Sequence, residues 1–135
     1  MTRDDITRDA TEIGAIITRW AEAVRARNLD GILADRSDDI LMFDVPPPTQ
    51  LRGIRAYGKS WEELFGWFGE TGTFEVDDVI VHAGGEVAFA TALIHCSGEG
   101  PKEGKAELEV RLTLGLRKSG GRWKVVHEHH SVPAP

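Results

Sequence analysis

The second half of the chain constrains the fold most, because it consists of long extended segments separated by short glycine-rich turns. The pattern predicts strands over Thr73 to His82, Glu86 to Ser97, Lys105 to Lys118 and Arg122 to Val132. Ala83-Gly84-Gly85 and Ser119-Gly120-Gly121 mark two turns, and a glycine-rich loop runs from Gly98 to Gly104. Successive strands joined by short turns pair antiparallel. This half therefore predicts an antiparallel meander.

The first half predicts helices. Apolar residues recur at helical spacing between Asp9 and Asn28, namely Ile13, Ile16, Ile17, Trp20 and Val24. A short second helix is expected from Leu29 to Arg36, ended by the polar run Ser37-Asp38-Asp39. After Gly53 a third helix is expected, with Gly69 as its stop. Its apolar stripe comprises Ile54, Tyr57, Trp61, Leu64, Phe65 and Phe68.

One strand is expected before the third helix. Its residues Ile40, Met42 and Asp44 alternate with Leu41, Phe43 and Val45. Pro46-Pro47-Pro48 ends it, because proline cannot donate to a strand ladder. Helices followed by a meander imply an α+β fold, with the helices packed on one face of a curved antiparallel sheet.

Length and charge exclude several classes of protein. The 135 residues fit a single domain, over residues 1–135. With 16 Lys and Arg against 22 Asp and Glu, the net charge of −6 argues against a nucleic-acid partner. No apolar run approaches the roughly 20 residues of a membrane span. The lone Cys96 excludes an intrachain disulfide, and the charged N-terminus lacks a signal-like apolar segment, so a cytoplasmic location is expected.

Three segments in this order resemble the nuclear transport factor 2-like superfamily. They are Arg19-Trp20 with Asn28 to Ile32, Asp38-Asp39 with Phe43-Asp44, and Trp123 to Pro133. The first two are similar to ketosteroid isomerases and SnoaL-like proteins. The last is also similar to the association domain of calcium/calmodulin-dependent protein kinase type II. The resemblance covers nearly the whole chain and implies a cone-shaped sheet closed by helices around a pocket.

Asp44 is the first candidate catalytic residue. It shares a face with Ile40 and Met42, so its carboxylate is expected to face the interior. Burial would raise its pKa, and the resemblance places it where the isomerases have their general base. The alternative is a structural carboxylate that pairs with an arginine or caps the turn. The isomerase oxyanion donors align with Trp20 and a position near Leu112, so an authentic steroid isomerase is not expected.

The last strand supplies the second candidate, His130. Val126, Glu128, His130 and Val132 form one row, which the resemblance places in the pocket. The other row, Trp123, Val125, His127 and His129, would lie on the outer sheet face and support a homodimer. His130 would serve as a proton shuttle or ligand donor, and Glu128, in the same row, is a candidate for binding the ligand. His127 and His129 share a face but lack a third ligand, so no metal is expected.

Further residues are candidates for binding a ligand. Trp20, Trp61 and Phe65 lie on helix faces that would cover the pocket, and Trp61 matches a pocket aromatic of the isomerases. The resemblance makes His95 a pocket wall, in a row with Phe89, Thr91 and Leu93. Arg111, if it points inward, would hold a ligand carboxylate or enolate, or Asp44 itself. Otherwise it forms an outer ion pair with Glu109 or Glu128.

The sequence leaves two functions open. One is a cofactor-independent acid–base enzyme of isomerase, cyclase or dehydratase type, acting on a small apolar carbonyl compound through Asp44 with His130 or Arg111 assisting. The other is a non-catalytic small-ligand-binding or oligomerisation domain. No dinucleotide, haem or flavin motif is present, so no cofactor is expected.

Overall fold

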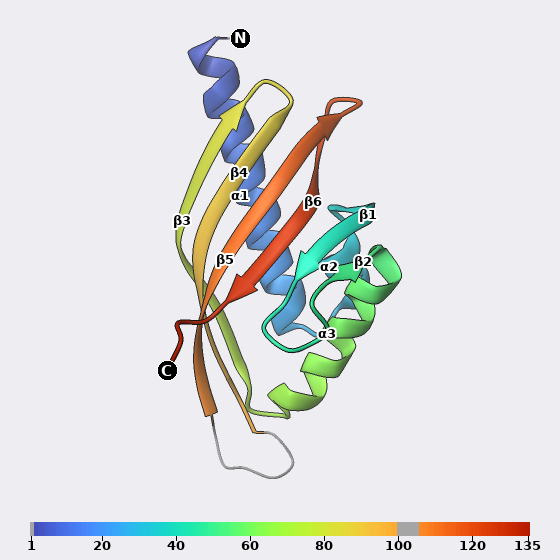
Figure 1. The fold of residues 1–135 in the computed structure, drawn as a ribbon. Coiled ribbons are helices and arrows are strands. Elements are labelled where there is room, and N and C mark those ends of the chain that lie inside the picture. The colour runs from blue at the N-terminus through green and yellow to red at the C-terminus, as the bar shows by residue number, and fades with distance from the viewer. Residues whose placement is uncertain (1, 100–105) are drawn as a thin grey trace.

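The computed structural model describes residues 2–99 and 106–135. Its elements are α1 (Arg3–Arg25), α2 (Leu29–Leu33), β1 (Arg36–Phe43), β2 (Leu51–Arg52), α3 (Ile54–Phe68), β3 (Thr73–Gly84), β4 (Val87–Gly98), β5 (Ala106–Ser119) and β6 (Arg122–Ser131). Within these described ranges the strands form one six-stranded sheet in the order β2-β1-β6-β5-β4-β3. Figure 1 shows α1 running along one face of the curved sheet, with α2 and α3 beside β1. The expected α+β fold is confirmed.

Helix α1 begins at Arg3, six residues before the predicted start. Thr2 and Asp5 form a capping box, because the Asp5 amide donates to the Thr2 hydroxyl at 3.1 Å and the Thr2 amide donates to the Asp5 carboxylate at 3.2 Å. The predicted apolar stripe, from Ile13 to Val24, is buried. No helix in the described part of the chain is long and apolar enough to cross a membrane.

The second helix is shorter than predicted, and Arg36 belongs to β1. The helix ends at Leu33, and the polar run 37–39 lies within the strand. The reason is long-range pairing, since β1 runs parallel to β6 with Arg36 opposite Val125 and Leu41 opposite His127. The Val125 amide also donates to the carbonyl of Asp35 at 2.8 Å. Sheet pairing therefore overrides the local helical pattern.

The meander follows the predicted order, and β3, β4, β5 and β6 each begin and end within about two residues of expectation. The predicted glycine-rich loop lies mostly outside the described residues. Between β1 and α3 the structure adds the short strand β2, which pairs with β1 through Leu51 opposite Met42. The buried row of β5 is Val110, Leu112, Leu114 and Leu116, as predicted, whereas Leu108 is exposed.

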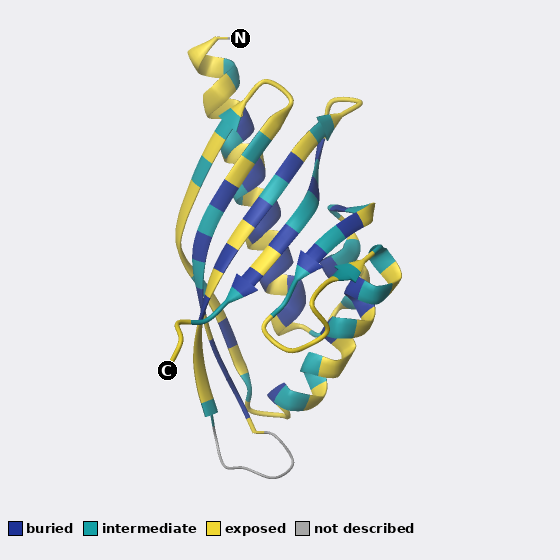
Figure 2. Ribbon diagram, viewed as in Figure 1, coloured by how far each residue is buried: buried dark blue, intermediate teal, exposed yellow. Residues whose placement is uncertain are grey.

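Two strands present the opposite face from the one predicted over part of their length. In β4 the buried residues are Ala90, Ala92, Ile94 and Cys96, and the row of Phe89 lies on the outer face. The changes of colour along this strand in Figure 2 show the alternation of burial. In β6 the pairing jumps from Leu116–Val125 to Gly115–His127, which leaves Val126 as a β-bulge. Trp123 and Val125 are therefore buried before the bulge, and Glu128 and His130 after it.

Gly98 sets how closely α3 approaches β4. A Cβ at this position would lie 2.5 Å from the carbonyl oxygen of Trp67, near the end of α3. We expect Gly98→Ala to lower the free energy of unfolding by about 1–3 kcal/mol, because backbone must move. Gly84→Ala is the matched control, since a Cβ there meets nothing within 4 Å. Urea unfolding measures both, and equal stability of the two variants would contradict this close approach.

Candidate functional site

A cavity of about 580 Å³ lies between α3, the segment after β1 and the inner face of the sheet. Its wall is mostly apolar and includes Met42, Leu51, Trp61, Phe74, Ile94 and Val110. The polar residues of the wall are Asp44, Lys59, Ser60, Glu63, Cys96 and His130. This volume is in the range that holds small organic ligands.

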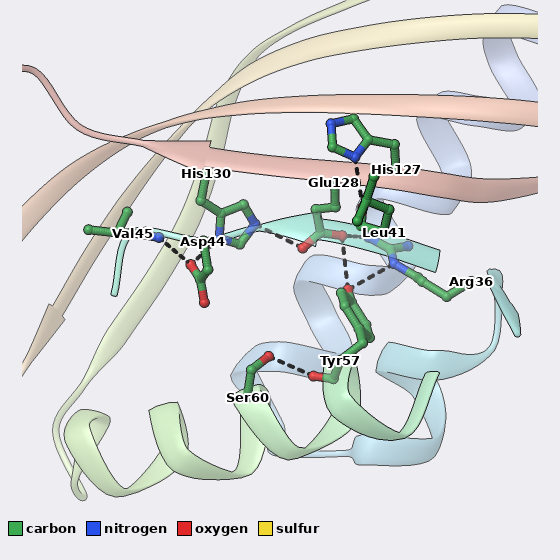
Figure 3. A network of polar contacts seen from close by, with 9 residues as sticks. All are labelled: Arg36, Leu41, Asp44, Val45, Tyr57, Ser60, His127, Glu128 and His130. Carbon is green, nitrogen blue, oxygen red and sulfur yellow. Dashed lines mark hydrogen bonds and ion pairs between the residues drawn. The ribbon is translucent and has the colours of Figure 1, made fainter. Parts of the chain in front are cut away.

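A continuous chain of polar side chains leads from the core to this cavity, as Figure 3 shows. Arg36 Nη2 donates to Glu128 Oε1 at 2.9 Å, and Arg36 Nε donates to the Tyr57 hydroxyl at 2.9 Å. The Tyr57 hydroxyl in turn donates to Glu128 Oε1 at 2.9 Å. His130 Nε2 contacts Glu128 Oε2 at 2.8 Å, and His130 Nδ1 lies 3.3 Å from Asp44 Oδ1.

The inner members of this chain are fully buried. The side chains of Arg36 and Glu128 are 0% exposed. The Arg36 guanidinium also lies over the ring of Trp20, 4.9 Å from its centroid, which stabilises the cation. Adjacent strands β1 and β6 supply Arg36 and Glu128, while α3 brings Tyr57 over them. The site therefore forms only when these elements are packed together.

Each charge in the chain stabilises its neighbour. Burial opposes ionisation of Glu128, but the Arg36 guanidinium and the hydrogen bond with His130 outweigh it and lower the pKa of Glu128 to about 2. Burial also opposes protonation of His130, but its hydrogen bonds with Asp44 and Glu128 raise the pKa of His130 to about 9. Burial raises the pKa of Tyr57 well above its ordinary value. At neutral pH His130 is therefore an imidazolium, with Nε2 donating to Glu128 and Nδ1 in an ion pair with Asp44.

Asp44 is the last of these linked polar side chains, and it lies on the cavity wall. It directly follows β1, and its side chain is 20% exposed. Oδ1 accepts the amide of Val45 at 2.8 Å and faces His130. Oδ2 has no hydrogen-bond partner among the described residues. One carboxylate oxygen is thus held while the other is free to meet a ligand.

The predicted aromatic residues divide into wall and core. Trp61 lines the cavity, and its ring centroid lies 6.0 Å from that of His130. Trp20 is buried against Trp61, with centroids 5.6 Å apart, and Phe65 is half-buried beside the core. Neither belongs to the described residues that line the cavity. The prediction that Trp20 and Phe65 bind a ligand is therefore not supported by their positions.

His95 and Arg111 lie on the outer face of the sheet, so the predicted place of His95 in the pocket is wrong, and of the two directions left open for Arg111 the outward one is found. His95 is paired across strands with Glu109, and its Nε2 lies 3.5 Å from an Asp77 carboxylate oxygen. Arg111 is exposed and donates to the Ser131 hydroxyl at 3.1 Å and to the Val132 carbonyl at 3.0 Å. Both follow from strand alternation, because their neighbours Ile94 and Val110 face inward.

The row predicted for a dimer interface is also changed. Trp123 and Val125 are buried, and Trp123 Nε1 donates to the buried Asp9 at 3.1 Å. His127 and His129 stay on the outer part of β6, with ring centroids 6.2 Å apart. The homodimer remains a prediction. Among the described residues no three His, Cys, Asp or Glu side chains come together as possible metal ligands.

Sequence reasoning missed the roles of Arg36 and Tyr57. Arg36 was assigned to a helix end, where an arginine is ordinarily solvated. Tyr57 was assigned to the apolar stripe of α3, although a buried hydroxyl needs a hydrogen-bond partner. The missing partner of the Tyr57 hydroxyl could have pointed to this contact, because Glu128 was already predicted to face inward. Glu128 itself lies behind His130 and is not among the described residues of the cavity wall.

The pKa values of Glu128 and His130 predict how stability depends on pH. The pKa of Glu128 is lowered from 4.5 to about 2, so its contribution to the free energy of unfolding is full above pH 4.5 and is lost as pH falls toward 2. The pKa of His130 is raised from 6.5 to about 9, so its contribution to the free energy of unfolding is full below pH 6.5 and is lost as pH rises through 9. Urea unfolding should give the highest stability near pH 5 to 6.5. His130→Gln should remove most of the alkaline decline, and an unchanged decline would contradict this assignment.

Removing one member of the buried ion pair should be more harmful than removing both. We expect Glu128→Gln to destabilise the fold by about 3–5 kcal/mol, because Arg36 is left as an uncompensated buried charge. The double variant Arg36→Met/Glu128→Gln should recover a large part of this loss. Denaturant unfolding of the two variants measures the difference. A double variant no more stable than Glu128→Gln would indicate that the two charges do not stabilise each other.

Comparison with known proteins agrees with this architecture. The family model described as "SnoaL-like domain" matches residues 13–135. An NTF2-like protein of unknown function from Pseudomonas putida KT2440 is 37% identical, with 96% of this chain and 89% of that chain covered and a TM-score of 0.85. No protein with a curated description matches the sequence.

More distant solved structures share the fold. An NTF2-like superfamily protein from Salmonella enterica is 18% identical, with 96% of this chain and 94% of that chain covered and a TM-score of 0.82. A ketosteroid isomerase-like protein from Erwinia carotovora atroseptica SCRI1043 is 18% identical, with 94% and 98% covered and a TM-score of 0.78. The chain thus belongs to the SnoaL-like domain family, within the nuclear transport factor 2-like superfamily.

Proposed function

We propose that this protein is a cofactor-independent acid–base enzyme that acts on a small, neutral, mostly apolar carbonyl compound. The observation that supports this most is Asp44, whose carboxylate has one oxygen fixed by Val45 and His130 and the other free at the wall of an apolar cavity. The fold family includes isomerases and dehydratases, which fits this chemistry. Asp44 is the general base, and His130 orients its carboxylate through Oδ1.

The reaction begins with proton abstraction. Asp44 Oδ2 takes a proton from the carbon next to the ligand carbonyl, and the electron pair of the C–H bond moves into an enolate. In an isomerase the same carboxyl returns the proton to another carbon. In a dehydratase the electron pair expels a neighbouring hydroxyl, which takes up the proton and leaves as water. The mostly apolar cavity wall favours both outcomes, because it attracts little water that could compete for the proton.

Charge balance suggests a neutral ligand. Arg36 and His130 are positive, whereas Glu128 and Asp44 are negative, so the chain of four groups carries no net charge. A ligand anion next to Asp44 would meet a carboxylate without a free cation to compensate it. Lys59 and Glu63 are exposed one helical turn apart on α3, so the rim carries one charge of each sign. The cavity therefore favours an uncharged ring system with a carbonyl group.

The alternative of a non-catalytic ligand-binding domain uses the same cavity. A binder of apolar compounds has no need for a carboxylate with an unused oxygen, since burying it without a partner is unfavourable. The two functions differ in one measurable respect. A binder retains its ligands without exchanging their protons.

Deuterium exchange tests the proposal without knowledge of the final product. A thermal-shift panel of neutral bicyclic and tricyclic ketones and hydroxyketones first identifies stabilising ligands. Each ligand is then incubated with the protein in D₂O, and proton NMR follows deuterium entering next to the carbonyl. We expect wild-type protein to accelerate this exchange and Asp44→Asn to reduce the rate by about 10²- to 10⁴-fold while the ligand still binds.

Asp39→Asn is the matched control, because Asp39 is an exposed carboxylate on β1 near Asp44 in the chain. Its exchange rate should equal that of the wild type. Binding without exchange across the panel would favour the ligand-binding domain. Exchange that survives in Asp44→Asn would remove Asp44 from the mechanism.

A further inference from the structure

The groups behind His130 are more elaborate than a ligand cavity requires. Arg36, Tyr57 and Glu128 are fully buried and are not among the described residues of the cavity wall. Well-packed apolar side chains would fill the same space without removing two charges from water. A buried ion pair of this kind is weak evidence for stability alone. Its geometry points to a task at His130.

Glu128 uses its two oxygens for different partners. Oε1 accepts from both Arg36 Nη2 and the Tyr57 hydroxyl, each at 2.9 Å. Arg36 Nε also donates to the Tyr57 hydroxyl at 2.9 Å, so these three groups form a closed triangle. Rotation of the carboxylate would break two of these contacts. The triangle therefore keeps Oε2 directed at His130 Nε2, 2.8 Å away.

We propose that Arg36 and Tyr57 are positioning residues of the acid–base site, which act through Glu128 to keep His130 protonated and its Nδ1 directed at Asp44. The inference rests on the proposed function, in which Asp44 is the base. Arg36 keeps Glu128 ionised, and Tyr57 fixes its orientation. Glu128 in turn supplies the negative charge that makes the imidazolium stable in a buried place.

The surroundings of His130 show why Glu128 matters. Asp44, after β1, and Glu128, on β6, contact its two ring nitrogens. From α3 the Trp61 ring contacts it, and β5 places the apolar Leu112 opposite it. Among the described residues, the further titratable groups of this region are Tyr57 and Arg36, which contact Glu128, and Cys96, Lys59 and Glu63, which line the same cavity as His130. Without the charge of Glu128, Asp44 alone would have to offset the burial of the imidazolium.

The titration of His130 tests this proposal in the full-length chain. Heteronuclear NMR follows its ring signals against pH, with His130→Gln used to assign them. In the wild type we expect the ring to stay protonated through pH 8. In Arg36→Met/Glu128→Gln, which removes both buried charges together, the midpoint should fall by about one pH unit or more. An unchanged midpoint would overturn the proposal.

A second ion pair, in which Asp9 is buried and Lys118 is partly exposed, provides a control. Asp9 of α1 accepts from Lys118 Nζ at 3.0 Å, and Lys118 lies beside the turn between β5 and β6, opposite Trp123. Asp9→Asn/Lys118→Met likewise removes one cation and one anion, at the other end of these strands. Its His130 midpoint should equal that of the wild type. The same fall in both double variants would mean a general structural effect and would contradict the proposal.

Tyr57→Phe keeps both charges and therefore provides a test if the double variant does not fold. It removes one hydrogen bond to Glu128 Oε1, so Glu128 should hold His130 Nε2–H less firmly. We expect this ring proton to exchange with water at least about tenfold faster than in the wild type. Equal exchange rates would exclude Tyr57 as a positioning residue.

These measurements use no substrate, so they separate the inference from the proposed function. A shifted His130 midpoint with no catalysed deuterium exchange would support the positioning role and reject the enzyme. Catalysed exchange that depends on Asp44, together with an unmoved His130 midpoint, would support the enzyme and reject the positioning role. In an active enzyme the alkaline limit of the rate should fall with the His130 midpoint.

Discussion

The contact between the Arg36 guanidinium and the Glu128 carboxylate is the interaction on which the candidate site depends. Both side chains are fully buried, and removing two such charges from water is unfavourable by several kcal/mol each. The structure offsets this with the Tyr57 hydroxyl, the His130 ring and the face of Trp20. Because these groups come from α1, α3, β1 and β6, the pair gains these contacts when the four elements are packed together, although Arg36 Nη1 has no hydrogen-bond partner among the described residues.

This arrangement resolves a conflict between an apolar cavity and a reactive carboxylate. A lone carboxylate facing apolar walls would take up a proton, and a lone histidine would release one. Along the chain from Arg36 to Asp44 the charges alternate, so each ion has an opposite neighbour. His130 and Asp44 both line the cavity, and Asp44 presents there a carboxylate oxygen that has no hydrogen-bond partner among the described residues. The protein thereby presents a base without placing a net charge in its interior.

Local patterns predicted the order of the main elements and the inward direction of Asp44, which shares a strand face with Ile40 and Met42. The inward place of His130 came from the family resemblance of its row, and the structure brings the two side chains within 3.3 Å. The alternation of β5 predicted its buried leucines in the same way as Asp44. For Asp44 and β5 the signal lies within one segment. Side-chain direction there follows from strand geometry alone.

The errors have a common cause, because each depended on pairing between distant segments. Arg36 left its predicted helix to pair with β6, and the bulge at Val126 turned Val125 inward. In β4 the resemblance placed the row of Phe89 in the pocket, whereas the structure buries the row of the small residues Ala90 and Ala92. Pairing the leucine row of β5 with β4 would have corrected this, but the intervening glycine-rich loop hides the register. The buried charges were hidden in the same way, since neither Arg36 nor Glu128 has its partner nearby in the sequence.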